Sequence, residues 1–433
     1  MVIERTINNV GYKLETRQIM NGDRPSMIIF LGILTLIWSV HASQCPLKFE
    51  GFGVFLGSNE HFGRSKPGTE AKVVQIVYES LGIRLFRTSY EQQFSPAIDK
   101  YEIKCNDPYT CSWINIHKAV SAYPDVKVFA SIWSPPHYMK NELFNLLPKY
   151  ETAFLHYIRN VTAIVKRDFN IDIEKVSPVN EPENVFATWD HTNMSPLQLC
   201  RIIRNFNDPL ISVCPENAWY SLTNTYFNIL SCFQPCEIKA THAYALNADL
   251  TSPNFKLGYY DLVSYSYRGT TGPIWMTEVS STYLDSDTTQ MNEALDLAIN
   301  IVNFVGVTCI QRYYFWYAYT KGHSGESLIW GNEEGDLFLP KKFFVYKLFV
   351  SASNTTSHGP VDVSRCEDKP FPCIQFDKVD RVLVNKASSE RTLQANECSS
   401  LCCVTEIDDF ICLDNTEHVP PRAVCHCALN VLS

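Results

Sequence analysis

Between residues 51 and 319, short apolar runs alternate with longer segments in which apolar residues recur every three or four positions. Glu151–Asp168 has the clearest helical pattern, and Met291–Phe304 repeats it. Several of the short runs are continuously apolar, as parallel strands buried on both faces are. These runs predict eight strands: Gly51–Leu56, Ile83–Ser89, Val126–Trp133, Lys175–Asn180, Ile211–Pro215, Glu237–Ala243, Pro273–Val279 and Cys309–Tyr317. Eight βα units in about 270 residues match the length of a (β/α)8 barrel. An open doubly wound sheet is the alternative, but no glycine-rich phosphate loop follows the first predicted strand.

The pattern changes after Lys341, where the apolar runs become short and alternating. These runs predict a small antiparallel β-sandwich: Phe343–Phe349, Val361–Ser364, Ile374–Phe376 and Val382–Asn385. Residues 398–433 are rich in cysteine and have the composition of loops. We therefore expect four parts: an N-terminal extension with a signal peptide (1–43), the barrel (44–340), a β-sandwich side domain with a strand from the N-terminal side (341–397), and a disulfide-bonded tail (398–433). The tail forms either a separate knot or a cap on the sandwich, and we favour the cap.

One long apolar run, Ile28–Trp38, lies near the N-terminus. Its length is typical of a signal-peptide core and is short for a membrane span, which needs about 20 residues. Arg24 precedes the run, and Val40-His41-Ala42 follows it as a small-residue cleavage site. We expect a secreted protein that begins at Met20 or Met27 and has no membrane span after cleavage. A signal-anchored or a lysosomal protein is the alternative.

All sixteen cysteines follow this segment, from Cys45 onward, so an oxidising compartment predicts up to eight disulfides. Cys105/Cys111 and Cys232/Cys236 are spaced as local loop staples, and eight cysteines crowd the chain after residue 365. Zinc is the competing interpretation, because Cys425-His426-Cys427 offers soft ligands, but no paired C-x2-C spacing accompanies it. Three sequons fit N-glycosylation in the secretory route: Asn160, Asn193 and Asn354.

The composition narrows the class of ligand. Apolar residues make up 45% of the chain and aromatic residues 13%, which is enough for a large core. The formal net charge is −9 and no cluster of Lys and Arg stands out, which argues against a nucleic-acid partner. An aromatic-rich, mildly acidic chain suits a neutral ligand. The oligomeric state is left open.

Two glutamates fall where a barrel carries its chemistry, at the carboxyl ends of predicted strands. Glu181 follows the fourth strand in Asn180-Glu181-Pro182-Glu183, and Glu278 ends the seventh in Trp275-Met276-Thr277-Glu278. Either glutamate alone could be an ordinary acidic residue in the first turn of a helix. Together they predict the paired carboxylates that glycosidic cleavage needs, one protonated to release the leaving group and one ionised to attack. No Gly-x-Ser-x-Gly elbow and no His-Glu-x-x-His motif occurs, so we expect neither a serine nucleophile, nor a metal, nor another cofactor.

These motifs, in this order along the chain, resemble the clan A retaining glycoside hydrolases, and within that clan glycoside hydrolase family 30. Besides Asn180-Glu181-Pro182 and Glu278, the resemblance rests on five further stretches: Gly51-Phe52-Gly53, Ile83-Arg84-Leu85-Phe86-Arg87, Ser131-Ile132-Trp133-Ser134-Pro135-Pro136, Thr241-His242-Ala243-Tyr244 and the strand of Trp316. It covers residues 49 to 385. The side domain departs from the family pattern, because His358-Gly359-Pro360 stands where many relatives have an Arg-Pro-Gly turn. The cysteine-rich tail has no counterpart in the family, and a polysaccharide-binding module is a second interpretation of it.

The resemblance implies a double displacement with net retention of configuration. Glu181 would be the general acid/base and Glu278 the nucleophile. Asn180 would bind the sugar 2-hydroxyl, and Arg87 would keep Glu278 ionised. His242 and Tyr244 would orient the nucleophile and the bound sugar, and Trp133 and Trp316 would stack on the sugar. Glu183 and Glu216 are weaker candidates for substrate contacts, and Lys321 or His323 could read an acidic side chain of a xylan.

Short loops favour an open cleft and internal cleavage of a β-linked polysaccharide such as xylan or β-1,6-galactan. A glucosylceramidase-like exo-enzyme acting on a glycolipid is one alternative. A catalytically silent, secreted carbohydrate-binding protein is another, since one fold can serve several functions.

Overall fold

The computed structural model describes residues 45–57, 60–206, 210, 212–219, 237–244, 272–280, 290–354, 359–366, 371–394, 397–413 and 417–429. The predicted signal segment and the Cys232/Cys236 staple lie outside these residues, as does the turn at His358. None of the helices described is long and apolar enough to cross a membrane.

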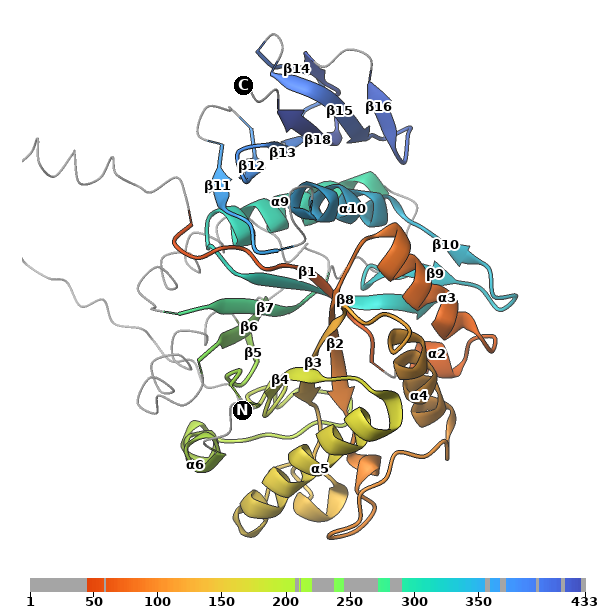
Figure 1. The fold of residues 1–433 in the computed structure, drawn as a ribbon, viewed down its shortest axis with the longest axis vertical. Coiled ribbons are helices and arrows are strands. Elements are labelled where there is room, and N and C mark those ends of the chain that lie inside the picture. Colours follow the sequence, from red (N-terminus) through yellow and green to blue (C-terminus); the bar gives the residue numbers. More distant parts are fainter. Residues whose placement is uncertain are drawn as a thin grey trace, which may run out of the picture. The chain divides into compact units, whose positions relative to one another are not determined.

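Eight parallel strands form the barrel, with the order β4-β3-β2-β1-β8-β7-β6-β5 (Figure 1). A parallel bridge between Asn180 and Glu216 joins the ends of this order, beside β4 and β5. The strands are β1 (Gly51–Phe55), β2 (Leu85–Tyr90), β3 (Lys127–Ile132), β4 (Ile173–Ser177), β5 (Asn217–Trp219), β6 (Lys239–Tyr244), β7 (Ile274–Val279) and β8 (Arg312–Lys321). The predicted barrel is thus confirmed. Two short strands lie beside the carboxyl end of β8: β9 (Ser327–Gly331) pairs with β8, and β10 (Leu337–Phe338) pairs with β9.

The helices follow the strands in the alternation that the sequence predicts. They are α2 (Glu60–Gly63), α3 (Thr69–Gln75, continued by a π-helical turn to Ser80), α4 (Pro108–Val120), α5 (Glu151–Phe169), α6 (Pro196–Phe206), α9 (Gln290–Gly306) and α10 (Lys341–Asn354). The aspartate before α4, Asp107, accepts hydrogen bonds from the amides of Tyr109 and Thr110, both at 2.9 Å, and so caps that helix. The apolar stripe of α5 is buried, as its spacing predicts.

Two strands differ from their predicted limits because of proline. The fourth was expected to run to Asn180, but it ends at Ser177, before Pro178. The fifth was expected over Ile211–Pro215, but β5 begins only after Pro215. Proline has no backbone N–H for a ladder, so regular pairing stops beside it. Only an isolated bridge from Val213 to Ile238 marks the expected fifth strand.

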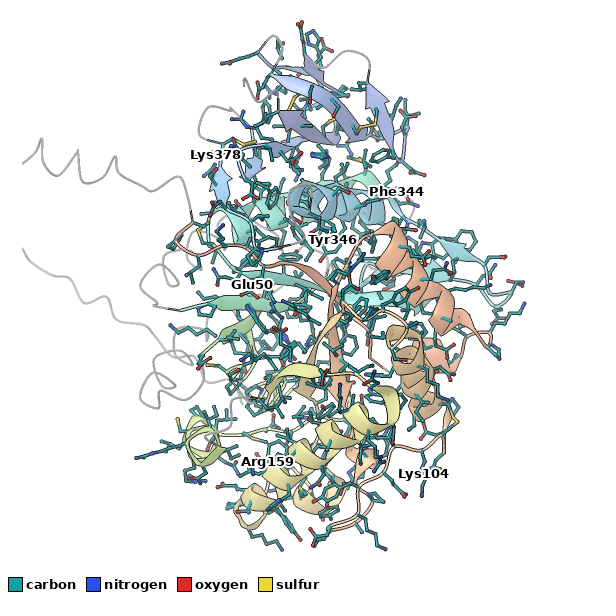
Figure 2. All side chains as sticks on the ribbon, viewed as in Figure 1. Glu50, Lys104, Arg159, Phe344, Tyr346 and Lys378 are labelled. Carbon is teal, nitrogen blue, oxygen red and sulfur yellow. A yellow bond between two sulfur atoms is a disulfide. The ribbon has the colours of Figure 1, made fainter. Side chains whose placement is uncertain are left out.

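The prediction of a strand over Phe343–Phe349 is wrong, because this segment belongs to helix α10. Its apolar residues are buried on several sides of the helix, so neither a two-residue nor a helical period stands out. The helix packs against α9 on one side and against the C-terminal sheet on another. Tyr346, labelled in Figure 2, donates a hydrogen bond from its hydroxyl to the carbonyl of Gly53 at 2.7 Å and so ties α10 to β1.

The C-terminal part is a six-stranded antiparallel sheet of order β11-β12-β13-β18-β15-β16. Its strands are β11 (Val363–Arg365), β12 (Cys373–Phe376), β13 (Asp380–Asn385), β15 (Cys398–Val404), β16 (Ile411–Leu413) and β18 (Ala423–Leu429), and a separate pair joins β14 (Arg391–Thr392) to β17 (His418–Val419). The loop-like interpretation of the tail is therefore wrong, since three of its strands pair in the sheet that begins before residue 397. Phe49, ahead of β1, forms an isolated antiparallel bridge with Val361, just before β11.

Disulfides hold the strands of this sheet to one another. All eight cysteines after residue 365 are paired: Cys366–Cys373, Cys398–Cys427, Cys402–Cys412 and Cys403–Cys425. The adjacent Cys402 and Cys403 bond to the residues directly opposite them on the two neighbours of β15, Cys412 of β16 and Cys425 of β18. Because successive side chains of a strand point to opposite faces, the two disulfides lie on opposite faces of the sheet. Disulfides, and not zinc, thus account for the tail cysteines. The expected staple Cys105–Cys111 is present, and Cys45–Cys309 anchors the chain ahead of β1.

Candidate active site

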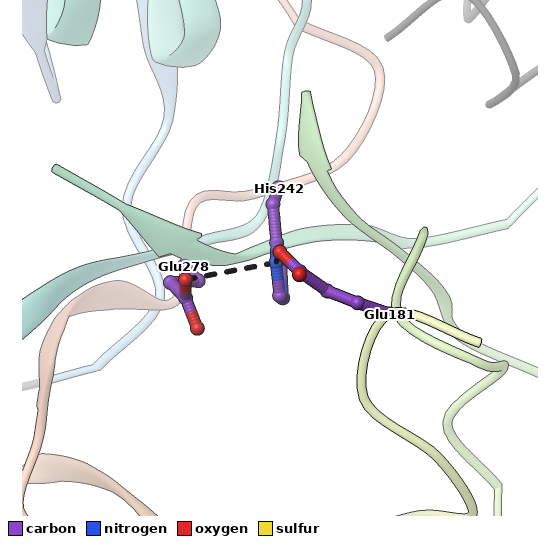
Figure 3. A group of neighbouring side chains, drawn as sticks. All are labelled: Glu181, His242 and Glu278. Carbon is purple, nitrogen blue, oxygen red and sulfur yellow. Dashed lines mark hydrogen bonds and ion pairs between the residues drawn. The ribbon is translucent and has the colours of Figure 1, made fainter. Parts of the chain in front are cut away.

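The residues implied by the family resemblance lie together at the carboxyl ends of the barrel strands. Arg87 comes from β2, Asn180 and Glu181 follow β4, His242 and Tyr244 lie on β6, and Glu278 lies on β7. Figure 3 shows Glu181 and Glu278 on either side of His242. All six side chains are connected by the hydrogen bonds and ion pairs described below.

Glu278 is buried and held from two sides. One carboxylate oxygen accepts a hydrogen bond from Nη1 of Arg87 at 2.7 Å, and the other accepts one from the hydroxyl of Tyr244 at 3.2 Å. Burial raises the pKa of Glu278, and Arg87 and His242 oppose that rise. Arg87 therefore acts in the direction expected for it, although burial outweighs it. Burial and the Glu278 carboxylate raise the pKa of Tyr244 well above its usual value, so its hydroxyl remains a donor.

Glu181 is also buried, and its backbone is in the left-handed region with φ of 45°. Such a conformation is strained for a side chain other than glycine, and it must be held by its surroundings. The amide of Glu181 donates to the carbonyl of Glu216 at 2.7 Å, and the carbonyl of Glu181 accepts from the amide of Asn184 at 3.0 Å. These two bonds fix the turn that carries the carboxyl group into the site.

His242 links the two carboxylates. Its Nδ1 is 2.8 Å from a carboxylate oxygen of Glu181 and 3.8 Å from one of Glu278. Burial alone would lower the pKa of His242, but the surrounding carboxylates raise it to about 10. The ring is therefore a cation at neutral pH, with Nδ1–H donating to Glu181. Both ring nitrogens face carboxylates, so the arrangement fits proton chemistry better than metal ligation.

Glu216 lies inside this cluster and does not fit its expected role as a substrate contact. Its side chain has no exposed surface. One oxygen lies 3.0 Å from Nη2 of Arg87 and 3.5 Å from Nε2 of His242, and the other accepts a short hydrogen bond from the hydroxyl of Ser131. Burial alone would raise the pKa of Glu216, but Arg87, His242 and Ser131 lower it to about 2.

Two polar residues of the loop after β4 support Glu181. Nδ2 of Asn184 donates to a carboxylate oxygen of Glu181 at 2.8 Å, an interaction that the sequence analysis missed. The sequence did contain a sign of this contact: Asn184 follows Glu181 by three residues, a spacing that brings both side chains to the same turn. Glu183 accepts a hydrogen bond from the amide of Ala218 at 2.6 Å, which joins this loop to β5. Burial and the nearby Glu181 raise the pKa of Glu183 to about 7.

An aromatic cluster lies beside the carboxylates. Trp133 stacks on Trp316 with ring centroids 5.1 Å apart, and Phe55 stacks on Trp316 at 4.4 Å. Arg87 lies 5.6 Å from the Trp316 ring, which places this cluster next to the site. Trp316 is almost completely buried, whereas Trp133 is partly exposed, and the indole N–H of Trp133 has no hydrogen-bond partner among the described residues. Of the two expected sugar platforms, Trp133 is the more accessible.

The two basic candidates, Lys321 at the end of β8 and His323 just after it, contact β9 and the turn that follows it. Lys321 is 3.3 Å from a carboxylate oxygen of Glu333, and the ring of His323 lies 5.5 Å from that of Trp330. Neither of these two contacts involves a residue of the carboxylate cluster. Their expected role in reading an acidic sugar stays a prediction.

The fold and this cluster define a (β/α)8 barrel with a carboxylate at the end of the fourth strand and another at the end of the seventh. Solved structures of glycoside hydrolase family 30 have the same fold. An endoxylanase of that family from Clostridium papyrosolvens C71 is 16% identical, with a TM-score of 0.62 over 90% of this chain and 98% of that chain. The catalytic domain of xylanase C from Talaromyces cellulolyticus is 16% identical, with a TM-score of 0.64 over the same shares. An endo-β-1,6-glucanase is 15% identical, with a TM-score of 0.64 over 89% of this chain and 92% of that chain.

At these identities the similarity shows the fold alone. That fold is the one expected for the family that the motifs resemble. No family model and no curated protein matches the chain.

Proposed function

We propose that the protein is a retaining β-glycosidase with Glu181 as general acid/base and Glu278 as nucleophile. The observation that carries the proposal is the spacing of the two carboxylates. One oxygen of each, together with a ring nitrogen of His242, lie within 4.8 Å of one another. Inverting enzymes separate their carboxyl groups by roughly 6.5–9.5 Å to admit a water molecule, and retaining enzymes by roughly 5–5.5 Å. The short spacing therefore supports direct attack by Glu278.

In the first step, a carboxylate oxygen of Glu278 attacks the anomeric carbon while Glu181 gives its proton to the departing oxygen. In the second step, Glu181 removes a proton from water, and the resulting hydroxide displaces Glu278 with a second inversion. Asn180 has its Oδ1 held by Nη2 of Arg87 at 2.6 Å, so its amide N–H groups remain to donate to the 2-hydroxyl of the sugar. This contact would strengthen in the transition state and raise the rate of both steps.

A secreted enzyme that cleaves β-linked polysaccharide internally, of the xylan or β-1,6-galactan type, is our first substrate assignment. The solved structures of similar fold include endo-acting xylanases and a β-1,6-glucanase, which supports a polymer of β-linked sugars. Trp133 is partly exposed in the aromatic cluster beside the carboxylates, and indole rings stack on the apolar side of a pyranose. The six disulfides among the described residues suit an extracellular protein. The three sequons remain predicted glycosylation sites.

A second candidate is cleavage of a glycolipid, which one surface feature favours. The loops after β3 and β4 expose large apolar side chains, with Leu143 71% exposed, Val185 64% and Phe186 77%. Val185 and Phe186 follow Glu181, the proposed general acid, by four and five residues. Exposed aliphatic groups gain more from an alkyl chain than from a hydroxylated sugar.

The test is cleavage of xylan, β-1,6-galactan, β-glucan and glucosylceramide by the secreted protein between pH 4 and 7. Glu278→Gln should abolish cleavage, whereas the control Glu142→Gln, at an exposed carboxyl in the loop after β3, should leave it unchanged. Proton NMR of the first product should show the β-anomer, and product sizes should separate internal from terminal cleavage. An α-anomer would refute retention. A folded protein that cleaves none of the four substrates would refute the proposal and favour a carbohydrate-binding role.

A further inference from the structure

Glu216 joins the fourth and fifth strands of the barrel through its backbone. Its amide donates to the carbonyl of Val179 at 3.0 Å, and its carbonyl accepts from the amide of Glu181 at 2.7 Å. These bonds form the parallel bridge between Asn180 and Glu216 that joins β4 to β5. The backbone role alone would suit any residue, so it does not explain a glutamate at this position.

The side chain of Glu216 meets both cations of the site from a fully buried position. Arg87 and His242 each lie between Glu216 and a catalytic carboxylate: Arg87 binds Glu278 at 2.7 Å, and His242 binds Glu181 at 2.8 Å. Glu216 contacts the other side of each cation, at 3.0 Å and 3.5 Å. When Glu181 is protonated it no longer compensates the charge of His242, and a buried cation without an anionic partner is costly, so Glu216 supplies the second negative charge that the two cations need.

Counting charges shows what Glu216 adds. With Arg87 and His242 as cations and Glu216 and Glu278 as anions, the buried cluster is neutral when Glu181 carries a proton. This is the protonation state that a retaining glycosidase needs before it binds substrate. Without the charge of Glu216, the same state would leave one uncompensated positive charge in a buried site, where charge is costly.

We propose that Glu216 is a positioning residue whose negative charge keeps Arg87 and His242 cationic and leaves one proton on the pair Glu181 and Glu278. This assignment rests on the proposed function and adds a third carboxylate to it. Glu216 itself touches no substrate, because its side chain has no exposed surface.

The ionisable groups around Glu216 come from four strands. They are Arg87 of β2, Glu181 and Glu183 after β4, His242 and Tyr244 of β6, and Glu278 of β7. Tyr244 adds no charge at neutral pH, because burial raises its pKa well above its usual value. Glu183, whose pKa burial raises to about 7, is partly ionised there in the wild type and in a Glu216 variant alike. Removing the negative charge of Glu216 therefore acts mainly on His242 and on the pair of catalytic carboxyls.

The experiment compares Glu216→Gln with the wild type in the full-length protein. Glutamine keeps the size of the side chain: its Oε1 can accept a hydrogen bond from Arg87, while its amide N–H donates to the hydroxyl of Ser131. The uncompensated positive charge should make the catalytic pair release its proton earlier, so the basic limb of kcat/KM should move to lower pH by about one unit or more. At pH 7, cleavage of a methyl glycoside should fall about tenfold or more. Cleavage of a dinitrophenyl glycoside should change little, because its leaving group needs no proton.

Two matched variants separate charge from structure. Ser131→Ala removes the hydrogen bond to Glu216 but keeps the charge, so the basic limb should stay in place. Glu216→Asp restores the charge and should return the limb toward its wild-type position, even at a lower rate. If Glu216→Gln lowers both substrates equally and leaves the limb unmoved, Glu216 has only a structural role and the proposal fails.

A measurement without substrate keeps this proposal separable from the proposed function. In wild-type protein with ring-15N-labelled histidine, the signal of His242, assigned through His242→Gln, should remain that of the cation at pH 7. In Glu216→Gln it should lose its proton at a pH at least one unit lower than in the wild type. An unchanged titration would refute the role of Glu216, whether or not the wild type cleaves a glycoside.

Discussion

Arg312 lies at the amino end of the barrel strands, opposite Glu181 and Glu278, and we expect its loss to lower stability but not activity. It begins β8, with its guanidinium 2.7 Å from Glu50 and 2.8 Å from Glu174, and it lies 4.0 Å from the ring centroid of Trp275. Arg312 itself is buried. Breaking a buried ion pair costs about 3–5 kcal/mol.

The two glutamates moderate this cost. Their side chains are 31% and 30% exposed, so water can partly solvate them once the arginine is gone. We therefore expect Arg312→Met to lower the free energy of unfolding by about 3 kcal/mol, the lower end of the buried range. For a unit of about 390 residues, the entropy of unfolding is about 0.8 kcal/mol/K, so the melting temperature should fall by about 4 °C.

The control is Arg84→Met, which breaks a surface pair. Arg84 lies 2.8 Å from Asp125, whose side chain is 55% exposed, and such pairs contribute under about 1 kcal/mol. Thermal unfolding should therefore separate the two variants by roughly 3 °C. Values of kcat/KM should match the wild type for both. Equal melting temperatures would refute the stabilising role of Arg312. A loss of activity in Arg312→Met alone would refute the expectation that this end of the barrel contributes to stability and not to activity.

The pH dependence gives a second test of the same ion pair. Burial alone would raise the pKa of Glu174, but Arg312 outweighs burial and lowers it. The stabilisation is therefore complete above the usual glutamate pKa of about 4.3 and is lost as the pH falls through the lowered value. The difference between wild type and Arg312→Met should shrink below about pH 4.

Three further outcomes are expected. Arg87→Met removes the cation that opposes the raised pKa of Glu278, so the acidic limb of the kcat/KM profile should move up by roughly 1–3 units; an unmoved limb would contradict this. Trp133→Ala, measured by calorimetry with an oligosaccharide in the Glu278→Gln background, should weaken binding about tenfold, and unchanged affinity would exclude a stacking role. Replacing Cys403 and Cys425 by serine opens a loop with a sequence separation of 22 and should lower stability by about 3 kcal/mol in thermal unfolding, with activity retained; loss of activity would tie the sheet to catalysis.

The sequence predicts the barrel and the position of Glu181 and Glu278 at its strand ends because both depend on the local order of residues. Each strand is a short apolar run, and no proline interrupts β7, the strand that carries Glu278. Where proline interrupts, as at Pro178 and Pro215, the limits shift by a few residues. Helix α10 escaped prediction because it is buried on several sides, and such a helix loses the periodicity that would reveal it.

The parts of the site that the sequence did not predict are those that depend on distance in space. Glu216 stands beside Pro215 at the start of the fifth strand and gives no local sign that it faces Arg87, 129 residues earlier. Its surroundings exist only once the barrel closes and brings β2, β3 and β6 around it. The sequence suggested a contact with substrate because a carboxylate at a strand end is usually exposed there; burial reverses that interpretation.

The left-handed backbone at Glu181 sets the proposed catalytic role of this residue against the stability of the fold. Holding a glutamate at φ of 45° costs about 1–3 kcal/mol, and glycine would adopt the same conformation without that strain. The strain at this turn therefore lowers the free energy of unfolding, and it is present because the residue is a glutamate. Glu181→Gly should produce a protein that no longer cleaves but offsets its lost side-chain contacts in part through a relaxed turn. Because the carboxylate of Glu181 is buried and bonded to His242 and Asn184, its contacts outweigh the strain of the turn, and stability would rise only if a substitution relaxed the backbone and also replaced those contacts.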